Sequence, residues 1–100
     1  MMPLLEFDDL ATEEARKAYR WYRRIDADLA GRFQAAFDQA VIEIEINPGT
    51  APKHLRGTRA CKVKRFPYLI VFKIKSSGAL VAYAVSHTSR KPGYWWKRTR

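Results

Sequence analysis

The sequence predicts an α+β domain in which two antiparallel helices pack on a small antiparallel sheet, in the order β-α-α-β-β-β. Apolar residues recur every three or four positions in the first half, and from Thr58 they recur every second position. The run Asn47-Pro48-Gly49 separates the two patterns and stops a helix. The chain has 100 residues and no linker or internal repeat, so we expect residues 1–100 to form a single domain.

The N-terminal segment predicts a short strand and a first helix. Leu4, Leu5 and Phe7 are the apolar residues of the strand. Thr12 is the expected N-cap of the helix, because two acidic residues follow it and negative charge is favoured in a first turn. Apolar side chains spaced by three and four residues then predict a helix over residues 13–25.

A second helix follows after a very short turn, which predicts that the two helices are antiparallel. Either Asp26 or Asp28 is its expected N-cap. Asn47-Pro48-Gly49 ends the helix, and a loop is expected to continue to Gly57. The apolar stripe of the helix consists of Leu29, Phe33, Ala36, Phe37, Ala40, Val41 and Ile44.

The second half predicts three strands at residues 59–65, 67–75 and 79–86, joined by short turns as an antiparallel meander. The apolar face of this sheet, which we expect to pack under the helices, carries Cys61, Val63, Ile70, Phe72 and Ile74. The opposite face then carries Lys62, Lys64, Lys73 and Lys75. The alternation therefore predicts a basic sheet surface.

Charge is divided unevenly between the two halves. The net charge is +9, but residues 1–50 carry −4 and residues 51–100 carry +13, because no carboxylate follows Glu45. Such an imbalance indicates an anionic partner. It also excludes a carboxylate base, a carboxylate metal site or an acidic calcium loop from the second half.

Residue counts exclude further classes of protein. Cys61, His54 and His87 do not supply a closed zinc site, and a single cysteine forms no disulfide framework. We therefore expect no metal and no other cofactor. The N-terminal run is too short for a signal peptide and acids follow it, and no stretch reaches the roughly 20 apolar residues of a membrane span. We expect a cytoplasmic protein without a membrane partner.

The basic sheet face and the aromatic tail together are typical of a reader of phosphate backbones. Tyr94, Trp95 and Trp96 provide rings that stack on bases in single-strand binders. The alternative for the lysines is a solubilising or edge-guarding role, and for the tryptophans it is docking of the tail on the core. The candidate nucleic-acid-binding residues are Arg59, Arg65, Lys73, Lys75, Arg90, Lys91 and Trp95.

Three further side chains have both a structural and a chemical interpretation. Cys61 is expected to be a small buried hydrophobe, and His54 is expected to be solvated in its loop. His87 ends the last predicted strand, where it is either a proton carrier or a hydrogen-bonded structural residue.

Two motifs give the sequence a family resemblance. Residues 65–68 read R-F-P-Y, and the chain closes with H-x-x-R-x-P-x-Y-W, which begins at His87. With the two helix patterns before them, these motifs resemble the RelE/ParE superfamily of toxins from bacterial type II toxin–antitoxin systems, and in particular its plasmid stabilisation protein branch. The resemblance covers nearly the whole chain. It implies a helical hairpin packed on a small, curved antiparallel sheet.

The resemblance implies one of two activities. RelE-like members cleave mRNA in the ribosome without a metal, and ParE-like members poison DNA gyrase. For cleavage, the implied catalytic residues are the strand lysines Lys62 and Lys64 and the closing tyrosine Tyr94, with His87 as a looser assignment.

The sequence departs from the RelE-like pattern at two positions. Leu69 and Thr88 stand where that pattern has arginines, and Arg65 and Arg90 lie close by in sequence. We nevertheless expect ribosome-dependent mRNA cleavage that inhibits translation. Gyrase inhibition is the alternative, and a non-toxic basic nucleic-acid-binding module is the third interpretation.

The resemblance also implies a neutralising antitoxin, and hence a toxin–antitoxin hetero-oligomer. We expect an acidic, amphipathic antitoxin segment to lie over the helical hairpin or over the basic sheet face, because covering that face removes both phosphate binding and self-repulsion.

Overall fold

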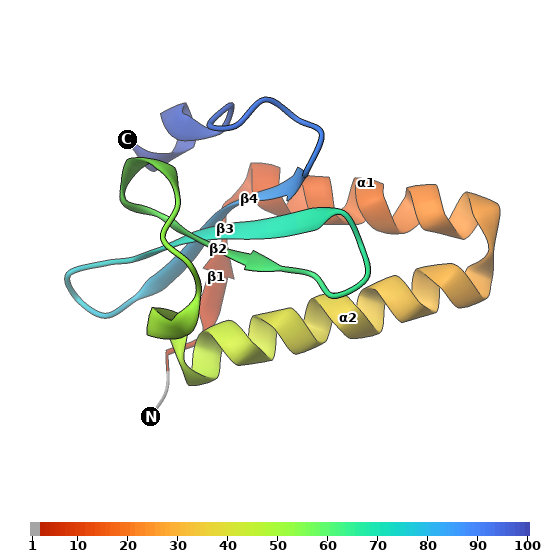
Figure 1. The fold of residues 1–100 in the computed structure, drawn as a ribbon, viewed down its shortest axis with the longest axis horizontal. Helices are drawn as coiled ribbons and strands as arrows, with labels where there is room; N and C mark the ends of the chain where they lie inside the picture. Colours follow the sequence, from red (N-terminus) through yellow and green to blue (C-terminus); the bar gives the residue numbers. More distant parts are fainter. Residues whose placement is uncertain (1–2) are drawn as a thin grey trace.

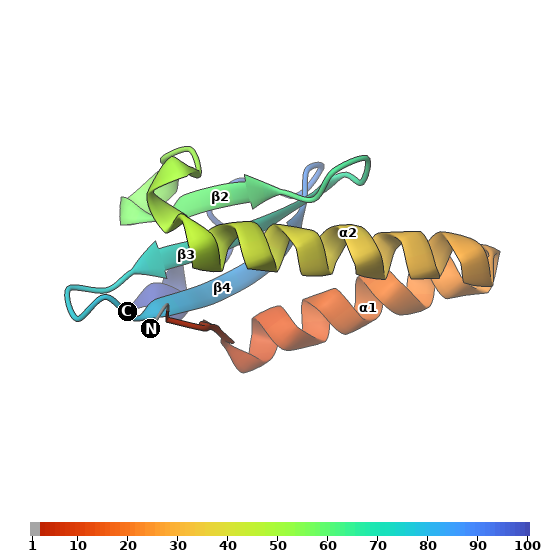
Figure 2. The same ribbon diagram turned by 90° about the horizontal axis from the view of Figure 1, so that it is seen from below.

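The computed structural model describes residues 3–100 and confirms the predicted class and element order. Two antiparallel helices cover one face of a four-stranded sheet, and the C-terminal segment crosses the other face (Figures 1 and 2). The helices and strands are β1 (Leu5–Phe7), α1 (Asp9–Ile25), α2 (Ala27–Ile46), β2 (Arg59–Lys62), β3 (Tyr68–Ile74) and β4 (Leu80–His87). Three short 3-10 turns are η1 (Pro48–Thr50), η2 (Leu55–Gly57) and η3 (Trp96–Thr99).

Helix α1 begins four residues earlier than the sequence predicts. Its N-cap is Asp8, whose carboxylate accepts a hydrogen bond from the backbone N–H of Leu10 at 3.0 Å. Thr12 lies inside the first turn, where its N–H donates to the Asp8 carbonyl. The predicted cap at Thr12 is therefore wrong, because Asp8 is an equally good cap and no helix breaker stands between the two residues.

Helix α2 has the predicted bounds. Asp26 alone separates it from α1 and caps it, since its carboxylate accepts from the N–H of Asp28 at 3.0 Å. The helix ends at Ile46, and Pro48 opens η1 in the segment expected to be a loop. In residues 3–100 no helix combines the length and the apolar character needed to cross a bilayer.

The sheet is mixed, with strand order β1-β4-β3-β2. The three later strands form the predicted antiparallel meander, but β1 pairs with β4 in parallel, Leu5 opposite Leu80. Strand β2 ends at Lys62 rather than Arg65. The chain turns there, because the Val63 N–H bonds to the Tyr68 carbonyl and Arg65 adopts a left-handed conformation with φ 69°.

The sheet has an apolar side chain layer on both faces. The main core lies between the helices and the sheet, and its fully buried members include Phe33, Ile44, Val63, Ile70, Phe72 and Leu80. A second, smaller cluster on the other face consists of Val71, Ala84 and Trp95, with Leu69 and Tyr94 packed against it. Ile74, expected to face the helices, is exposed at the end of β3.

Candidate functional site

Of the four predicted strand lysines only Lys62 and Lys73 lie in strands, at opposite ends of the sheet, so the prediction of one shared basic sheet face is wrong. The C-terminal segment covers the face opposite the helices. Lys62 and Lys64 instead border a groove of about 500 Å³ between the start of the β2–β3 turn and α2, which we call the edge groove. The Lys62 ammonium bends back and donates to the carbonyls of Val63 at 3.2 Å and Phe66 at 2.7 Å.

The other two lysines lie at the opposite end of the sheet. A Cβ atom added at Gly57 would lie 3.5 Å from Cε of Lys73, so the Lys73 stem runs beside η2. Lys75 is exposed in the β3–β4 turn, where its N–H bonds to the Ala79 carbonyl. The alternation failed as a guide to the lysines because β2 ends at Lys62 and β3 ends at Ile74, which leaves Lys64 and Lys75 in turns.

One carboxylate joins α1, β4 and the C-terminal segment. Glu14 accepts hydrogen bonds from the Val85 N–H at 3.1 Å, the Tyr94 hydroxyl at 2.5 Å and the Arg98 guanidinium at 2.8 Å. Arg98 also donates to the Tyr83 carbonyl at 3.0 Å. We call Glu14, Val85, Tyr94 and Arg98 the Glu14 cluster. It attaches the tail to the body of the molecule.

The surroundings of Tyr94 in the Glu14 cluster raise the pKa of its hydroxyl. Burial, followed by the hydrogen bond to the Glu14 carboxylate, raises the pKa of Tyr94 from 10.0 to about 12. The Arg90 guanidinium stacks over the tyrosine ring, 3.8 Å from its centroid. The hydroxyl is therefore protonated near neutral pH, and its proton is held by an internal acceptor.

His87 lies on the other side of the same region. Its Nδ1 accepts from the Ser89 N–H at 3.0 Å, so in the neutral ring the proton resides on Nε2. The Tyr68 ring packs edge-on against it at 5.1 Å, and Arg90 shares with it a small cavity of about 230 Å³. His87 thus has a hydrogen-bonded structural role and a partly exposed ring.

The structure does not gather the four candidate catalytic residues. Lys62 stands opposite Leu69 on β3, and Leu69 stands opposite Ser86 on β4. Two strand spacings, about 10 Å, therefore separate the backbone at Lys62 from the strand that ends in His87. Lys62 and Lys64 border α2, whereas His87 and Tyr94 border α1.

The candidate nucleic-acid-binding residues are also dispersed. Arg59 is a structural residue, because its guanidinium donates to the carbonyls of Gly49 and Ala51. Trp95 is 1% exposed against the sheet, so the prediction that it contacts nucleic acid is wrong and the alternative of tail docking is confirmed. Arg65, Arg90 and Lys91 are exposed.

The surroundings of Cys61 and His54 can be compared with those that the sequence predicts. Cys61 is partly buried against α2, with Sγ 4.0 Å from the Ala40 carbonyl oxygen, and burial raises the pKa of its thiol. His54, expected to be solvated, packs instead on the Trp95 ring with 5.9 Å between centroids. Within residues 3–100, no three His, Cys, Asp or Glu side chains gather in a way that would hold a metal ion.

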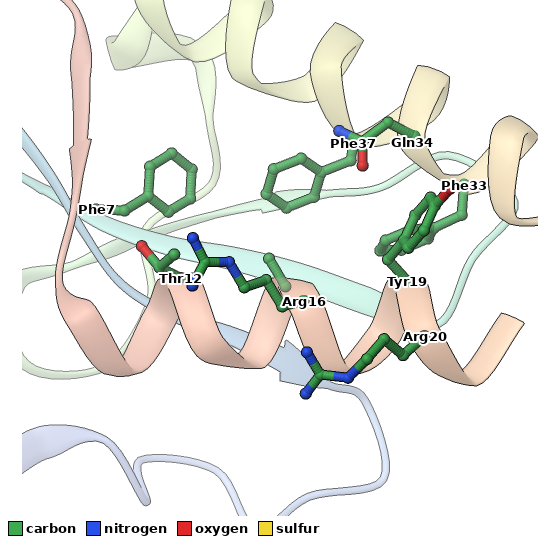
Figure 3. Close-up of a pocket in the computed structure, with 9 residues that line it drawn as sticks. Phe7, Thr12, Arg16, Tyr19, Arg20, Phe33, Gln34 and Phe37 are labelled. Atoms are coloured by element: carbon green, nitrogen blue, oxygen red, sulfur yellow. The ribbon is translucent and has the colours of Figure 1, made fainter. Parts of the chain in front are cut away.

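The helices enclose an apolar groove of about 460 Å³, which we call the helix groove (Figure 3). Phe7, Tyr19, Phe33 and Phe37 supply its apolar walls. Arg16 lies along its opening, while the Arg20 side chain points away from the groove (Figure 3). The groove therefore combines aromatic walls with a cationic side chain at its opening.

A comparison with known protein families shows which family this chain belongs to. The sequence matches the family described as "ParE toxin of type II toxin-antitoxin system, parDE" over residues 5–92. The chain belongs to the ParE toxin family. This matches the RelE/ParE resemblance carried by the two sequence motifs. A search of curated proteins found no match.

Two solved structures share the fold of this ParE-family chain. One is the chromosomal ParDE toxin–antitoxin system from P. aeruginosa, with a TM-score of 0.73, 17% identity, and coverage of 88% of this chain and 98% of that one. The other is a mutant of the E. coli toxin RelE in the free state, with a TM-score of 0.60, 17% identity, and coverage of 89% and 86%.

Sequence reasoning missed Glu14 and Arg98 in this ParE-family chain. Glu14 was interpreted only as an acid near a helix start. It lies three residues after Ala11 and four before Ala18, which are both buried, so the helical period itself places Glu14 on the buried stripe. No comparable signal indicated Arg98, which is paired with a residue 84 positions earlier.

Proposed function

We propose that this ParE-family toxin acts by binding and inhibiting DNA gyrase, and that it does not cleave mRNA. The observation that supports this proposal is the hydrogen bond that the Tyr94 hydroxyl donates to Glu14 inside the Glu14 cluster. The proposal replaces our first expectation from the sequence with its alternative.

Metal-free RNA cleavage makes three demands on a protein. A base must remove the 2′-hydroxyl proton, cations must stabilise the charged phosphorane, and an acid must protonate the departing 5′-oxygen. Tyr94, with a pKa of about 12 and an internal acceptor, is a poor acid at neutral pH. The Lys62 ammonium is occupied by two backbone carbonyls, and Lys62, Lys64 and Arg65 border α2, whereas His87 borders α1.

The experiment compares two reactions with one protein preparation. Purified toxin is added to gyrase with relaxed plasmid, and separately to translating ribosomes with a defined mRNA. We expect loss of supercoiling and accumulation of gyrase–DNA breaks, with intact mRNA. Codon-positioned cuts in the mRNA without any effect on gyrase would overturn the proposal, and so would inactivity in both reactions.

A matched variant sharpens the comparison. Tyr94→Phe removes the hydroxyl implied in cleavage and leaves the ring in place. We expect it to inhibit gyrase as the wild type does, at a temperature where both proteins are folded. A selective loss of an mRNA-cutting activity in Tyr94→Phe would contradict the proposal directly.

Ribosome-dependent cleavage is retained as a second candidate for one reason. His87 and Arg90 line the same small cavity, and the neutral ring of His87 carries its proton on Nε2. These two groups are an acid and a cation of the kind that cleavage uses. Cuts that disappear in His87→Gln but persist in Tyr94→Phe would favour this candidate.

The proposed partner is an antitoxin whose acidic, amphipathic segment fills the helix groove. The aromatic walls of the groove match an apolar helix face, and Arg16 matches acidic residues at its margin. We expect Arg16→Glu to weaken the complex about tenfold or more, as measured by calorimetry with the purified antitoxin. Arg24→Glu, an exposed change near the end of α1, is the control. Equal losses in both variants would refute this location.

A further inference from the structure

Three cationic side chains converge on a single tryptophan. The Arg56 guanidinium lies 4.7 Å from the centroid of the Trp96 ring, the Arg100 guanidinium 5.2 Å, and the Lys97 ammonium 5.9 Å. Arg56 belongs to η2, and the other residues belong to or follow η3. Lys91 lines a cavity of about 480 Å³ beside them, together with Arg56 and Trp96. We call Arg56, Lys91, Trp96, Lys97 and Arg100 the Trp96 patch.

The charge of the Trp96 patch is not balanced inside the protein. No aspartate or glutamate follows Glu45 in the sequence. Within residues 3–100, the side chains of Arg56, Lys97 and Arg100 form no hydrogen bond or ion pair with the protein, apart from their contact with the indole ring. Cation–π attraction holds each charge near the ring, but the cations still repel one another. An anion bound among them removes that repulsion.

The backbone under the Trp96 patch is anchored rather than loose. Arg56 adopts the left-handed conformation, with φ 56°, which a non-glycine residue takes only when its surroundings hold it there. The Thr58 hydroxyl donates to the Leu55 carbonyl across η2, and the Thr99 hydroxyl donates to the Trp96 carbonyl in η3. The buried Trp95 side chain fixes η3 on the sheet. The backbone that carries the cations is thus held in place in the free protein.

We propose that the Trp96 patch binds the phosphodiester backbone of nucleic acid. Planar guanidinium groups match phosphate oxygens in a two-pronged geometry, and this patch holds two of them. The cations come from three separate segments, at residues 56, 91 and 97–100, and together they present several positive charges on one surface, which suits a polyanion. All three side chains that lie over the indole ring are cations, so the contact is electrostatic and independent of base sequence.

This inference goes beyond gyrase inhibition and does not depend on it. The patch is separate from the edge groove and the helix groove, and it adjoins the Glu14 cluster, because Tyr94 also lines its cavity. The binding it predicts requires neither gyrase nor a ribosome. A failed gyrase assay therefore leaves this proposal standing, and a failed binding assay leaves the gyrase proposal standing.

The test is the salt dependence of binding by fluorescence anisotropy. A labelled short DNA duplex and an RNA duplex of the same sequence are titrated with toxin over a series of NaCl concentrations. The slope of log affinity against log salt steepens by about 0.9 for each phosphate that the protein neutralises. We expect the double variant Arg56→Gln/Arg100→Gln to lower that slope by about two and the affinity several-fold.

Matched controls separate the patch from net charge. Arg23→Gln/Arg24→Gln removes the same charge from the exposed end of α1 and is expected to leave the slope nearly unchanged. Lys97→Gln/Arg100→Gln repeats the test without touching the strained backbone at Arg56. Circular dichroism confirms that each variant is folded.

Three outcomes decide the proposal. A slope that falls only in the two patch variants supports it, and the better-bound duplex then identifies DNA or RNA as the preferred source of phosphates. Equal falls in the patch and control variants overturn it in favour of general attraction. Patch-dependent binding of poly-glutamate as tight as that of either duplex also overturns it, in favour of an acidic protein partner.

Discussion

Glu14 shows how much a single side chain does in this small protein. Strand β1 pairs with β4 only as far as Ala82, so the N–H of Val85 on the same edge has no strand partner there. Glu14 satisfies this donor and at the same time receives Tyr94 and Arg98 from the tail. An unpaired N–H at this position and an unpaired Arg98 would both cost free energy, since Arg98 is only 17% exposed in its side chain.

The hydroxyl of Tyr94 contributes to stability through this cluster. Tyr94→Phe removes one hydrogen bond to a charged acceptor, while Glu14 keeps its bonds to Val85 and Arg98. We expect the free energy of unfolding to fall by about 1.5 kcal/mol in urea titrations. Tyr68→Phe is the control, because the Tyr68 hydroxyl forms no hydrogen bond within residues 3–100. Equal losses in the two variants would show that the Glu14 contact contributes nothing.

Tyr94 also gives stability a dependence on alkaline pH. The pKa of Tyr94 is raised from 10.0 to about 12 in the folded protein, so folding favours the neutral phenol. Its contribution is fully present below pH 10.0 and is lost as pH rises through 12. The stability difference between wild type and Tyr94→Phe should therefore shrink across this window, as measured by urea unfolding at several pH values. If the stability difference between the two proteins stayed constant across this window, folding would not raise the pKa of Tyr94.

At the scale of elements, the helix caps can be tested against each other. Asp8→Ala removes the observed cap of α1 and should lower the free energy of unfolding by about 1 kcal/mol. Thr12→Ala alters the cap that the sequence suggested and should change it by a few tenths at most, since Thr12 lies inside the helix. Chemical denaturation measures both. A larger loss in Thr12→Ala would contradict the observed start of α1.

Elements that depend on neighbouring residues were predictable, and those that depend on distant ones were not. The hairpin of α1 and α2 follows from local spacing and from Asp26, and the meander follows from alternation and short turns. The parallel partner of β1 lies 75 residues away, so no local pattern indicates it. The start of α1 was ambiguous because two capping residues compete within one turn.

The same distinction applies to the candidate site. Lys62 was placed correctly in a strand, but the direction of its side chain depends on carbonyls freed by the turn that follows. Trp95 was one of two adjacent tryptophans, and only the packing of the tail on Val71 and Ala84 decides which one is buried. The family could be predicted from the sequence because its motifs are contiguous. The hydrogen bond from Tyr94 to Glu14 could not be predicted, because the two residues are 80 positions apart.

On the scale of the whole molecule, the division of charge has a structural meaning. The mixed-charge half forms β1 and the two helices, and the acid-free half forms the rest of the sheet and the tail. Glu14 is the acid that reaches across this division to join the tail. The remaining cations of the second half, including the Trp96 patch, are largely uncompensated.

Self-repulsion among these cations predicts a salt effect on stability. Moderate NaCl should raise the urea midpoint of the isolated toxin, because screening weakens repulsion in the compact state. We expect the free energy of unfolding to rise by an amount on the order of 1 kcal/mol. Arg56→Gln/Arg100→Gln should show a smaller gain, since it removes part of the repulsion. A midpoint that falls with salt would mean that attractive pairs dominate instead.

The parallel pairing of β1 with β4 also bears on how the chain is made. Synthesis is vectorial, so Leu5 leaves the ribosome long before Leu80, its partner in the sheet, has been polymerised. The tail residues that hydrogen-bond to Glu14 are made later still, 80 and 84 residues after it. Until β4 and the tail have been made, the aromatic side of the helical hairpin lacks part of the sheet on which it packs. The fold is therefore completed only after β4 and the tail have left the ribosome.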